Sequence, residues 1–141
     1  MNYSTFDINN FFIKKDSTLP ELVYPLIQHT LEQYKITKEM LENVAVTFSM
    51  IDAETGLYRI ANVPASIEYK KLRPEYPDNF LYALVYRFKL PQTSKAGRYL
   101  GEFVVDFIPS GNNGGCGKIK FPVDNVINIQ ISDSITKTTV I

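Results

Sequence analysis

The chain has 141 residues and a mass of 16.1 kDa, and its 15 basic and 15 acidic side chains give a formal net charge of zero. A neutral chain has no long-range field to hold a nucleic-acid backbone or an anionic membrane, so neither is an expected partner. Nine Tyr and nine Phe with no Trp favour strands, and a chain of this length can bury its own core.

A single cysteine, Cys116, excludes an internal disulfide framework and gives no support for structural zinc, so we expect synthesis in a reducing cytoplasm. The first residues lack the basic-then-apolar order of a signal peptide. No apolar run approaches the roughly 20 residues of a membrane span. We therefore expect a soluble, uncleaved chain.

No internal repeat or linker divides the chain, so one domain is predicted. Residues 1–10 are polar and are expected to form an extended arm, residues 11–131 a β-sandwich, and residues 132–141 a β-prone tail that can pair with a neighbouring chain.

Two short strands are predicted early in the sandwich, at residues 11–15 and 22–27. Pro20 and Pro25 lack backbone donors, which predicts that the second strand lies at a sheet edge or outside the ladder. Residues 28–43 are the only credible helical insertion, with Thr37 as a helix cap, and only a turn or two of helix is expected there.

A hairpin is predicted next. Residues 44–50 alternate apolar and small polar side chains, residues 52–56 supply a turn that ends in glycine, and residues 57–63 return as a second strand. Residues 65–70 form a further short strand, and residues 71–79, with two prolines, form a loop.

Residues 80–108 are predicted to be the centre of the domain, as a hairpin of two long strands joined by a polar turn. Each strand places apolar residues on one face at a spacing of two, and that face is expected to meet a second sheet. These residues are Phe80, Tyr82, Leu84, Tyr86 and Phe88, then Tyr99, Gly101, Phe103, Val105 and Phe107. After a glycine-rich loop at residues 110–117, strands are predicted at residues 118–123, at an edge because of Pro122, and at residues 125–131.

Motifs for chemistry are weak throughout. The glycine-rich residues 111–118 resemble a phosphate-binding loop only superficially, because Asn112 stands where glycine is required and Ile119 where Ser or Thr is required. Cys116 and the only histidine, His29, carry no motif that promises a nucleophile and base. We predict no catalytic, cofactor-binding or metal-binding residue, and no cofactor.

Acidic side chains offer two pairs that glycoside hydrolysis could use, Asp52 with Glu54 and Glu102 with Asp106. The first pair belongs to a turn, and the second is separated by about 13 Å along a strand, beyond the spacing of such mechanisms. Solvated charge is the favoured interpretation of all four. Six tyrosines could stack on sugars or bases, although packing is the commoner use of alternating aromatics; these are Tyr58, Tyr69, Tyr76, Tyr82, Tyr86 and Tyr99.

Three segments together resemble a known family. They read NVAVTFSMIDAETGLYRIANVPASI, YALVYRFKLPQTSKAGRYLGEFVVDFI and GKIKFPVDNVINIQI. This run is similar to the N-terminal domain of phage baseplate upper proteins and to related modules of tailed-phage virion proteins. The matching positions are Thr47, Phe48, Met50, Asp52, Thr93, Gly97, Tyr99, Gly101, Glu102, Phe103, Pro122, Ile127 and Ile129, with Asp16, Leu19 and Pro20 upstream.

The resemblance implies an antiparallel immunoglobulin-like β-sandwich and a non-enzymatic structural role in the virion. The expected role is an adaptor or anchoring subunit for fibres or other attachments on the head, collar or baseplate, in contact with other virion proteins and as a homo-oligomer. The insertion at residues 28–43 departs from the family pattern and could be a local docking feature. The alternative is a free carbohydrate-binding module on the same sandwich, and an enzyme is the weakest option.

Overall fold

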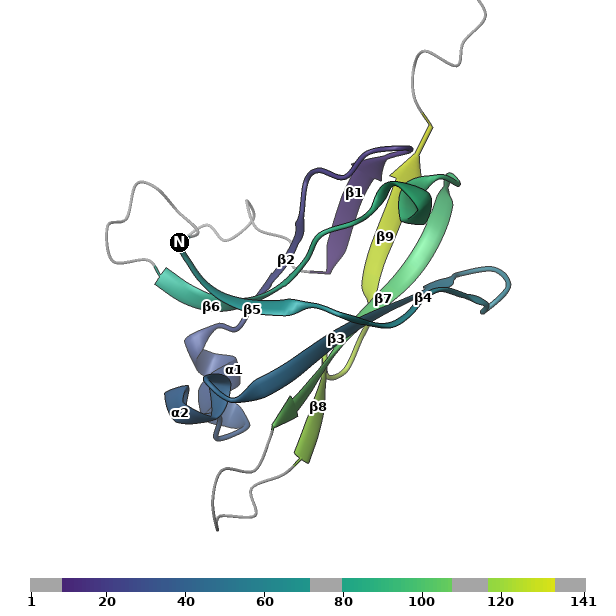
Figure 1. The fold of residues 1–141 in the computed structure, drawn as a ribbon. Coiled ribbons are helices and arrows are strands. Elements are labelled where there is room, and N and C mark those ends of the chain that lie inside the picture. The colour runs from purple at the N-terminus through teal and green to yellow at the C-terminus, as the bar shows by residue number, and fades with distance from the viewer. Residues whose placement is uncertain (1–8, 72–79, 108–116, 134–141) are drawn as a thin grey trace, which may run out of the picture.

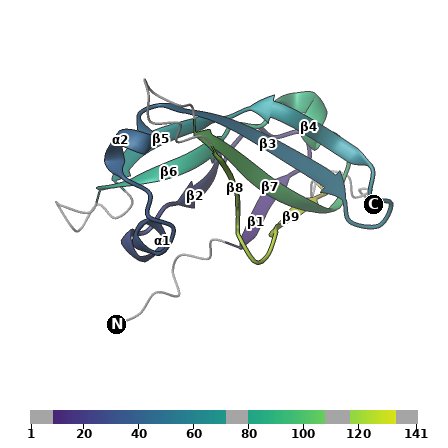
Figure 2. The same ribbon diagram turned by 90° about the horizontal axis from the view of Figure 1, so that it is seen from below.

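A computed structural model describes residues 9–71, 80–107 and 117–133. Two sheets pack against each other in a sandwich-like arrangement, with two short helices beside one end (Figures 1 and 2). The prediction of a mostly β protein built as a sandwich is confirmed. Most of the predicted arm (residues 1–10), loop (71–79), glycine-rich segment (110–117) and tail (132–141) lies outside the described residues, which omit residues 1–8, 72–79, 108–116 and 134–141.

The larger sheet has the strand order β1-β9-β7-β3-β4, and β8 also pairs with β7. Its strands are β1 (Asn10–Lys14), β3 (Val44–Asp52), β4 (Tyr58–Pro64), β7 (Gly97–Phe107), β8 (Gly117–Phe121) and β9 (Ile127–Ser132). The pairing of β1 with β9 is parallel, whereas the other ladders are antiparallel, so the prediction of a purely antiparallel sandwich is wrong at this edge.

The smaller sheet has the order β2-β6-β5, with β2 (Leu22–Pro25), β5 (Ser66–Lys71) and β6 (Phe80–Tyr86). The edge position of β2 confirms the prediction made from the prolines, because a strand that ends in proline pairs on one side only. The helices α1 (Gln28–Gln33) and α2 (Lys38–Leu41) connect β2 to β3, and a 3-10 helix, η1 (Leu90–Thr93), lies between β6 and β7.

The central hairpin predicted for residues 80–108 is wrong. β6 and β7 belong to different sheets, and the chain crosses from one sheet to the other through η1. The apolar faces of the two strands face each other across the core from opposite sheets, and the strands do not pair side by side. Tyr86 of β6 stacks on Phe48 of β3, in the other sheet, with ring centroids 4.6 Å apart.

β8 and β9 pair with successive halves of one edge of β7. β8 pairs with residues 103–107 of β7, and β9 pairs with residues 97–101. The two short strands therefore act as one interrupted strand, with Pro122 in the segment that separates them. This arrangement keeps Phe121, Ile127, Ile129 and Ile131 on the buried face, at 1% exposure or less.

The core confirms the buried face predicted for residues 99–107. In β6 the prediction holds only in part, because Tyr82 is half-buried and the opposite face, at Ala83 and Val85, is buried too. Phe103 and Val105 are fully buried and Phe107 is 5% exposed, and Leu84, Tyr86 and Phe88 close the core from the other side. Tyr24 of the small sheet tilts against Phe103 and Phe121 of the large one. The hydrophobic contact between sheets is thus made mainly by aromatic rings, which bury large apolar areas.

The hairpin of β3 and β4 forms as predicted. The Asp52 carboxylate accepts hydrogen bonds from the backbone N–H groups of Glu54 and Thr55, at 2.8 Å and 3.1 Å. Gly56 has φ +74°, a left-handed conformation that glycine adopts without strain. These N–H bonds lower the pKa of Asp52 from its usual value, because they stabilise the charged form.

Candidate functional site

The helical insertion and the small sheet enclose a cleft of about 490 Å³. Both ribbon views place α1 and α2 beside the end of the small sheet, next to β5 and β6 (Figures 1 and 2). The floor of the cleft is apolar and consists of Leu26, Leu31, Ile36 and Leu41. Its volume falls within the range of sites that bind small ligands, which makes it a candidate for a functional site.

A fixed backbone motif shapes the helical wall of the cleft. Lys35 ends α1 with φ 56°, and its N–H donates to the carbonyl of Glu32. The N–H of Ile36 donates to the carbonyl of Leu31 at 2.8 Å. This is a Schellman motif, in which a residue in the left-handed region closes the helix and an apolar pair covers the closure. Leu31 and Ile36, which form that pair, both line the cleft.

A second cap starts α2 immediately afterwards. The N–H of Met40 donates to the Thr37 hydroxyl at 3.2 Å, and Thr37 N–H contacts the Met40 sulfur at 3.5 Å. The prediction of Thr37 as a helix cap is confirmed. Two caps within three residues hold the helices in a tight corner over the sheet.

Tyr69 and Tyr82 form the opposite wall. They are direct cross-strand partners in β5 and β6, and their ring centroids lie 4.9 Å apart with an interplanar angle of 56°. Tyr69 is 60% exposed, whereas Tyr82 is half-buried. The polar rim is formed by Gln28, Glu32, Lys35, Thr37 and Lys38. Gln28 donates to Glu32 across one turn of α1, at 3.1 Å.

Of the five candidate stacking tyrosines that the structure describes, only this pair lines the cleft. Tyr86 and Tyr99 are buried in the core, and Tyr58 is 66% exposed at the start of β4. Tyr76 lies outside the described residues. Sequence reasoning did not find the helical wall, because its pairing with the tyrosines is long-range. The available signal was the insertion itself, with its Thr37 cap.

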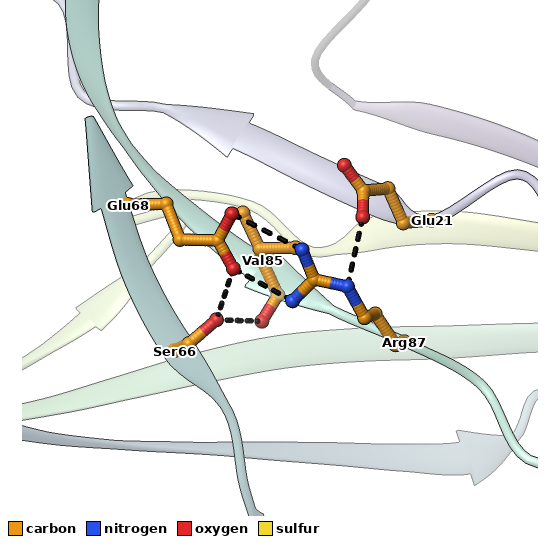
Figure 3. A network of polar contacts seen from close by, with 5 residues as sticks. All are labelled: Glu21, Ser66, Glu68, Val85 and Arg87. Atoms are coloured by element: carbon orange, nitrogen blue, oxygen red, sulfur yellow. Dashed lines mark hydrogen bonds and ion pairs between the residues drawn. The ribbon is translucent and has the colours of Figure 1, made fainter. Parts of the chain in front are cut away.

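A polar network crosses the outer face of the small sheet (Figure 3). Arg87, just after β6, reaches both carboxylate oxygens of Glu68 in β5, at 2.6 Å and 3.1 Å, and Glu21, just before β2, at 3.0 Å. The Ser66 hydroxyl lies 2.9 Å from Glu68 and 3.5 Å from the Val85 carbonyl oxygen. The hydrogen bonds to Glu68 raise the pKa of Arg87 from its usual value. Arginine's planar fork suits it to clamp the three strands together.

The carboxylates considered for chemistry do not assemble into a reactive group within the part of the chain that the structure describes. Asp52 caps its turn, Glu102 and Asp106 lie four residues apart on the half-buried outer face of β7, and His29 is exposed in α1. Cys116 lies outside the described residues. Across residues 9–71, 80–107 and 117–133, no three His, Cys, Asp or Glu side chains gather as metal ligands would. Over the same residues, no helix has the length and apolarity that crossing a membrane requires.

Comparison with known proteins gave no match among family models, curated proteins or solved structures.

Proposed function

We propose that the chain is an immunoglobulin-like domain that serves as a non-enzymatic structural component of a tailed-phage virion. Its role would be an adaptor or anchoring subunit for fibres or other attachments on the head, collar or baseplate. Its partners would be other virion proteins and further copies of itself, with no nucleic acid and no membrane among them.

Strand order supports the immunoglobulin-like part of the proposal. Immunoglobulin domains place strands G, F and C in one sheet, with C′ added in the variable type, and B, E and D in the other. If β2 to β7 are taken as B, C, C′, D, E and F, and β9 as G, then β9-β7-β3-β4 matches G-F-C-C′. The order β2-β6-β5 matches B-E-D.

A tyrosine near the start of β7 supports the same assignment. The Tyr99 hydroxyl donates to the carbonyl of Lys95, four residues upstream, at 2.8 Å. Immunoglobulin-like sandwiches carry a tyrosine corner of this kind at the start of strand F, where the hydroxyl fixes the turn that leads into the strand.

The observation that carries the functional proposal is the place of the family motif in the structure. Phe48 of β3, Gly101 of β7 and Ile129 of β9 come from three separate motif segments, and the side chains of Phe48 and Ile129 both lie against Gly101 in the core. Thr93 is fully buried, and its hydroxyl donates to the Ser17 carbonyl, which ties the opening segment to η1. The motif positions therefore have structural tasks, which supports a resemblance at the level of the fold and a role based on that fold.

Exposed apolar side chains on adjoining segments offer a surface for assembly. Leu19, Leu57, Tyr58 and Leu90 are between 55% and 74% exposed. Their segments adjoin, because hydrogen bonds join them. The guanidinium of Arg59, which follows Tyr58, donates to the carbonyls of Pro91 and Gln92, and the Thr93 hydroxyl donates to the Ser17 carbonyl. Four large exposed apolar side chains on adjoining segments favour an assembly subunit, because exposed apolar surface is what a protein partner covers. We call these four residues the apolar end.

The proposal is tested by incorporation into particles. The tagged chain is expressed in cells infected by the phage that encodes it, and gradient-purified particles are probed for the tag. We expect the wild-type chain in the particle fraction and loss of a variant in which Leu57, Tyr58 and Leu90 are all changed to Ser. Val123→Ser, at a residue 47% exposed in the segment between β8 and β9, is the matched control. Absence of the wild-type chain from particles would overturn the virion role.

A free carbohydrate-binding module is the second candidate function. The observation that favours it is the exposed ring of Tyr69 beside Tyr82 in the wall of the cleft. The same fractionation separates the two functions, because a free module stays in the soluble fraction while a structural subunit sediments with particles.

A further inference from the structure

We infer that the cleft between the helical insertion and the small sheet binds a saccharide, with a pyranose ring placed against Tyr69. We call this cleft the helix–sheet cleft. The inference does not depend on the virion role, since both a particle-bound subunit and a free domain could carry such a site. It rests on the shape of the cleft, its aromatic wall and its polar rim.

The aromatic wall is the first step. Tyr69 and Tyr82 lie on the inner face of the small sheet, the face that farther along the sheet carries Leu84 and Tyr86 into the core. At this end the helices close over the sheet incompletely, so that Tyr69 is 60% exposed within a concave surface. A tyrosine ring presents a large, rigid contact area with little conformational entropy to lose on binding.

The tilt between the two rings is the second step. At an interplanar angle of 56°, the rings do not stack flat on each other, and together they form an angled apolar wall. The negative face of an aromatic ring attracts the electropositive C–H groups that line one face of a pyranose. The size of the cleft, about 490 Å³, leaves room for one or two sugar rings.

The rim supplies the polar half of the recognition. Sugar hydroxyls both donate and accept hydrogen bonds, and the rim offers a carboxylate on Glu32, an amide on Gln28 and a hydroxyl on Thr37. The Gln28 to Glu32 hydrogen bond holds the first two groups in one orientation on α1. A cleft with an apolar floor, an aromatic wall and a polar rim suits an amphipathic pyranose ring better than a purely apolar segment of a protein partner.

Charge at the rim predicts a preference among saccharides. Lys35 and Lys38 against Glu32 give the rim one excess positive charge at neutral pH. A saccharide that carries a carboxylate should therefore bind more tightly than its neutral counterpart, and the difference should shrink in high salt because exposed charges are screened.

The experiment begins with a glycan array that includes neutral and carboxylated pyranosyl oligosaccharides, probed with the purified full chain. The best oligosaccharide is then titrated calorimetrically against the wild-type chain and three variants, each first checked for an unchanged thermal unfolding midpoint. We expect Tyr69→Ala to weaken binding at least tenfold and Tyr69→Phe, which keeps the ring, to weaken it less than threefold. Phe12→Ala is the matched control, because Phe12 is an aromatic residue of similar exposure, 68%, outside the cleft.

Three outcomes would overturn the inference. The first is that the folded chain gives no signal on the array and shows no binding in a follow-up titration with millimolar saccharide. The second is a saccharide whose affinity is the same for wild type and Tyr69→Ala. The third is a peptide, selected from a random display library, that requires Tyr69 for binding while no saccharide does. The predicted preference is tested with a double variant, Lys35→Gln with Lys38→Gln. Weaker binding of a carboxylated saccharide by this variant, with wild-type affinity for the neutral counterpart, would support it.

Discussion

Gly101 in β7 and Ile129 in β9 lie so close together that no side chain fits between them. A β-carbon built on Gly101 would come 2.7 Å from Cδ1 of Ile129, and 3.0 Å from Cζ of Phe48 on the neighbouring strand. Both neighbours are fully buried, so they have little room to move aside. The glycine at this position of β7 lets β3 and β9 carry large side chains, Phe48 and Ile129, into one layer of the core.

Gly101→Ala should lower the free energy of unfolding by about 1–3 kcal/mol, the usual cost of overpacking a core. Urea unfolding followed by circular dichroism measures it. Gly117→Ala is the matched control, because nothing lies within 4 Å of a β-carbon at that position. Adding Ile129→Val, which removes the clashing Cδ1, should recover part of the loss. Equal stability of Gly101→Ala and Gly117→Ala would contradict the packing account.

Thr93→Val should destabilise the domain by about 1–3 kcal/mol, because it leaves the partly buried Ser17 carbonyl without its hydroxyl donor. The hydroxyl of Thr93 lies 2.8 Å from that carbonyl oxygen, and Thr93 is fully buried. Thr93→Ser keeps the donor and loses only a methyl group, so it should cost less. Thermal unfolding of the three proteins gives the comparison, and a Ser variant weaker than the Val variant would refute the role of the hydrogen bond.

Stability should fall at alkaline pH. Burial is the main cause that raises the pKa of Tyr24, Tyr86 and Tyr99 above the ordinary value of 10.0. Above about pH 10 the unfolded chain loses these protons before the folded chain does, so the unfolded state is favoured as the pH rises. Below that pH the three groups are protonated in both states, and their contribution to stability is fully present.

The measurement is urea unfolding at several values from about pH 9 to about pH 11. The slope of the unfolding free energy against pH should be negative above about pH 10 and less steep when Tyr24, Tyr86 and Tyr99 are replaced by Phe. A triple Phe variant with the slope of the wild type would show that other groups cause the alkaline loss.

Arg87→Lys should lower the thermal midpoint slightly, because a lysine ammonium cannot bind both carboxylate oxygens of Glu68 and Glu21 in the fork geometry of arginine. Arg87 is exposed, so water and salt weaken the clamp, and the difference should shrink in high salt. Arg98→Lys, on an exposed position of β7, is the control. Identical effects of the two changes at low salt would count against the clamp.

Local patterns predicted most of the strands. β7 and β9 alternate buried and less buried side chains along their length and β3 does so in its middle, and this period-two signal is contained within the strand itself. The same signal misplaced β6 and β7 as a hairpin. An apolar face looks identical in sequence whether its strand pairs with the next one or packs against it from the opposite sheet.

The candidate site shows the same limit. Tyr69 and Tyr82 are 13 positions apart, and their meeting depends on the register of β5 against β6, which no local pattern specifies. The clamp on the outer face likewise joins Glu68 in β5 to Glu21, just before β2, and Arg87, just after β6. The sequence around each of these residues predicts only an ordinary solvated charge.

The sequence by itself determined which segments extend, which face of each strand is apolar, and where Thr37 and Gly56 shape the chain, because these depend on neighbours a few residues away. Only the tertiary structure decided which sheet each strand joins, the parallel entry of β1 beside β9, and the formation of the helix–sheet cleft. The physical reason is that burial of apolar surface has no direction of its own, so the choice among partners is made only when the strands and helices pack together.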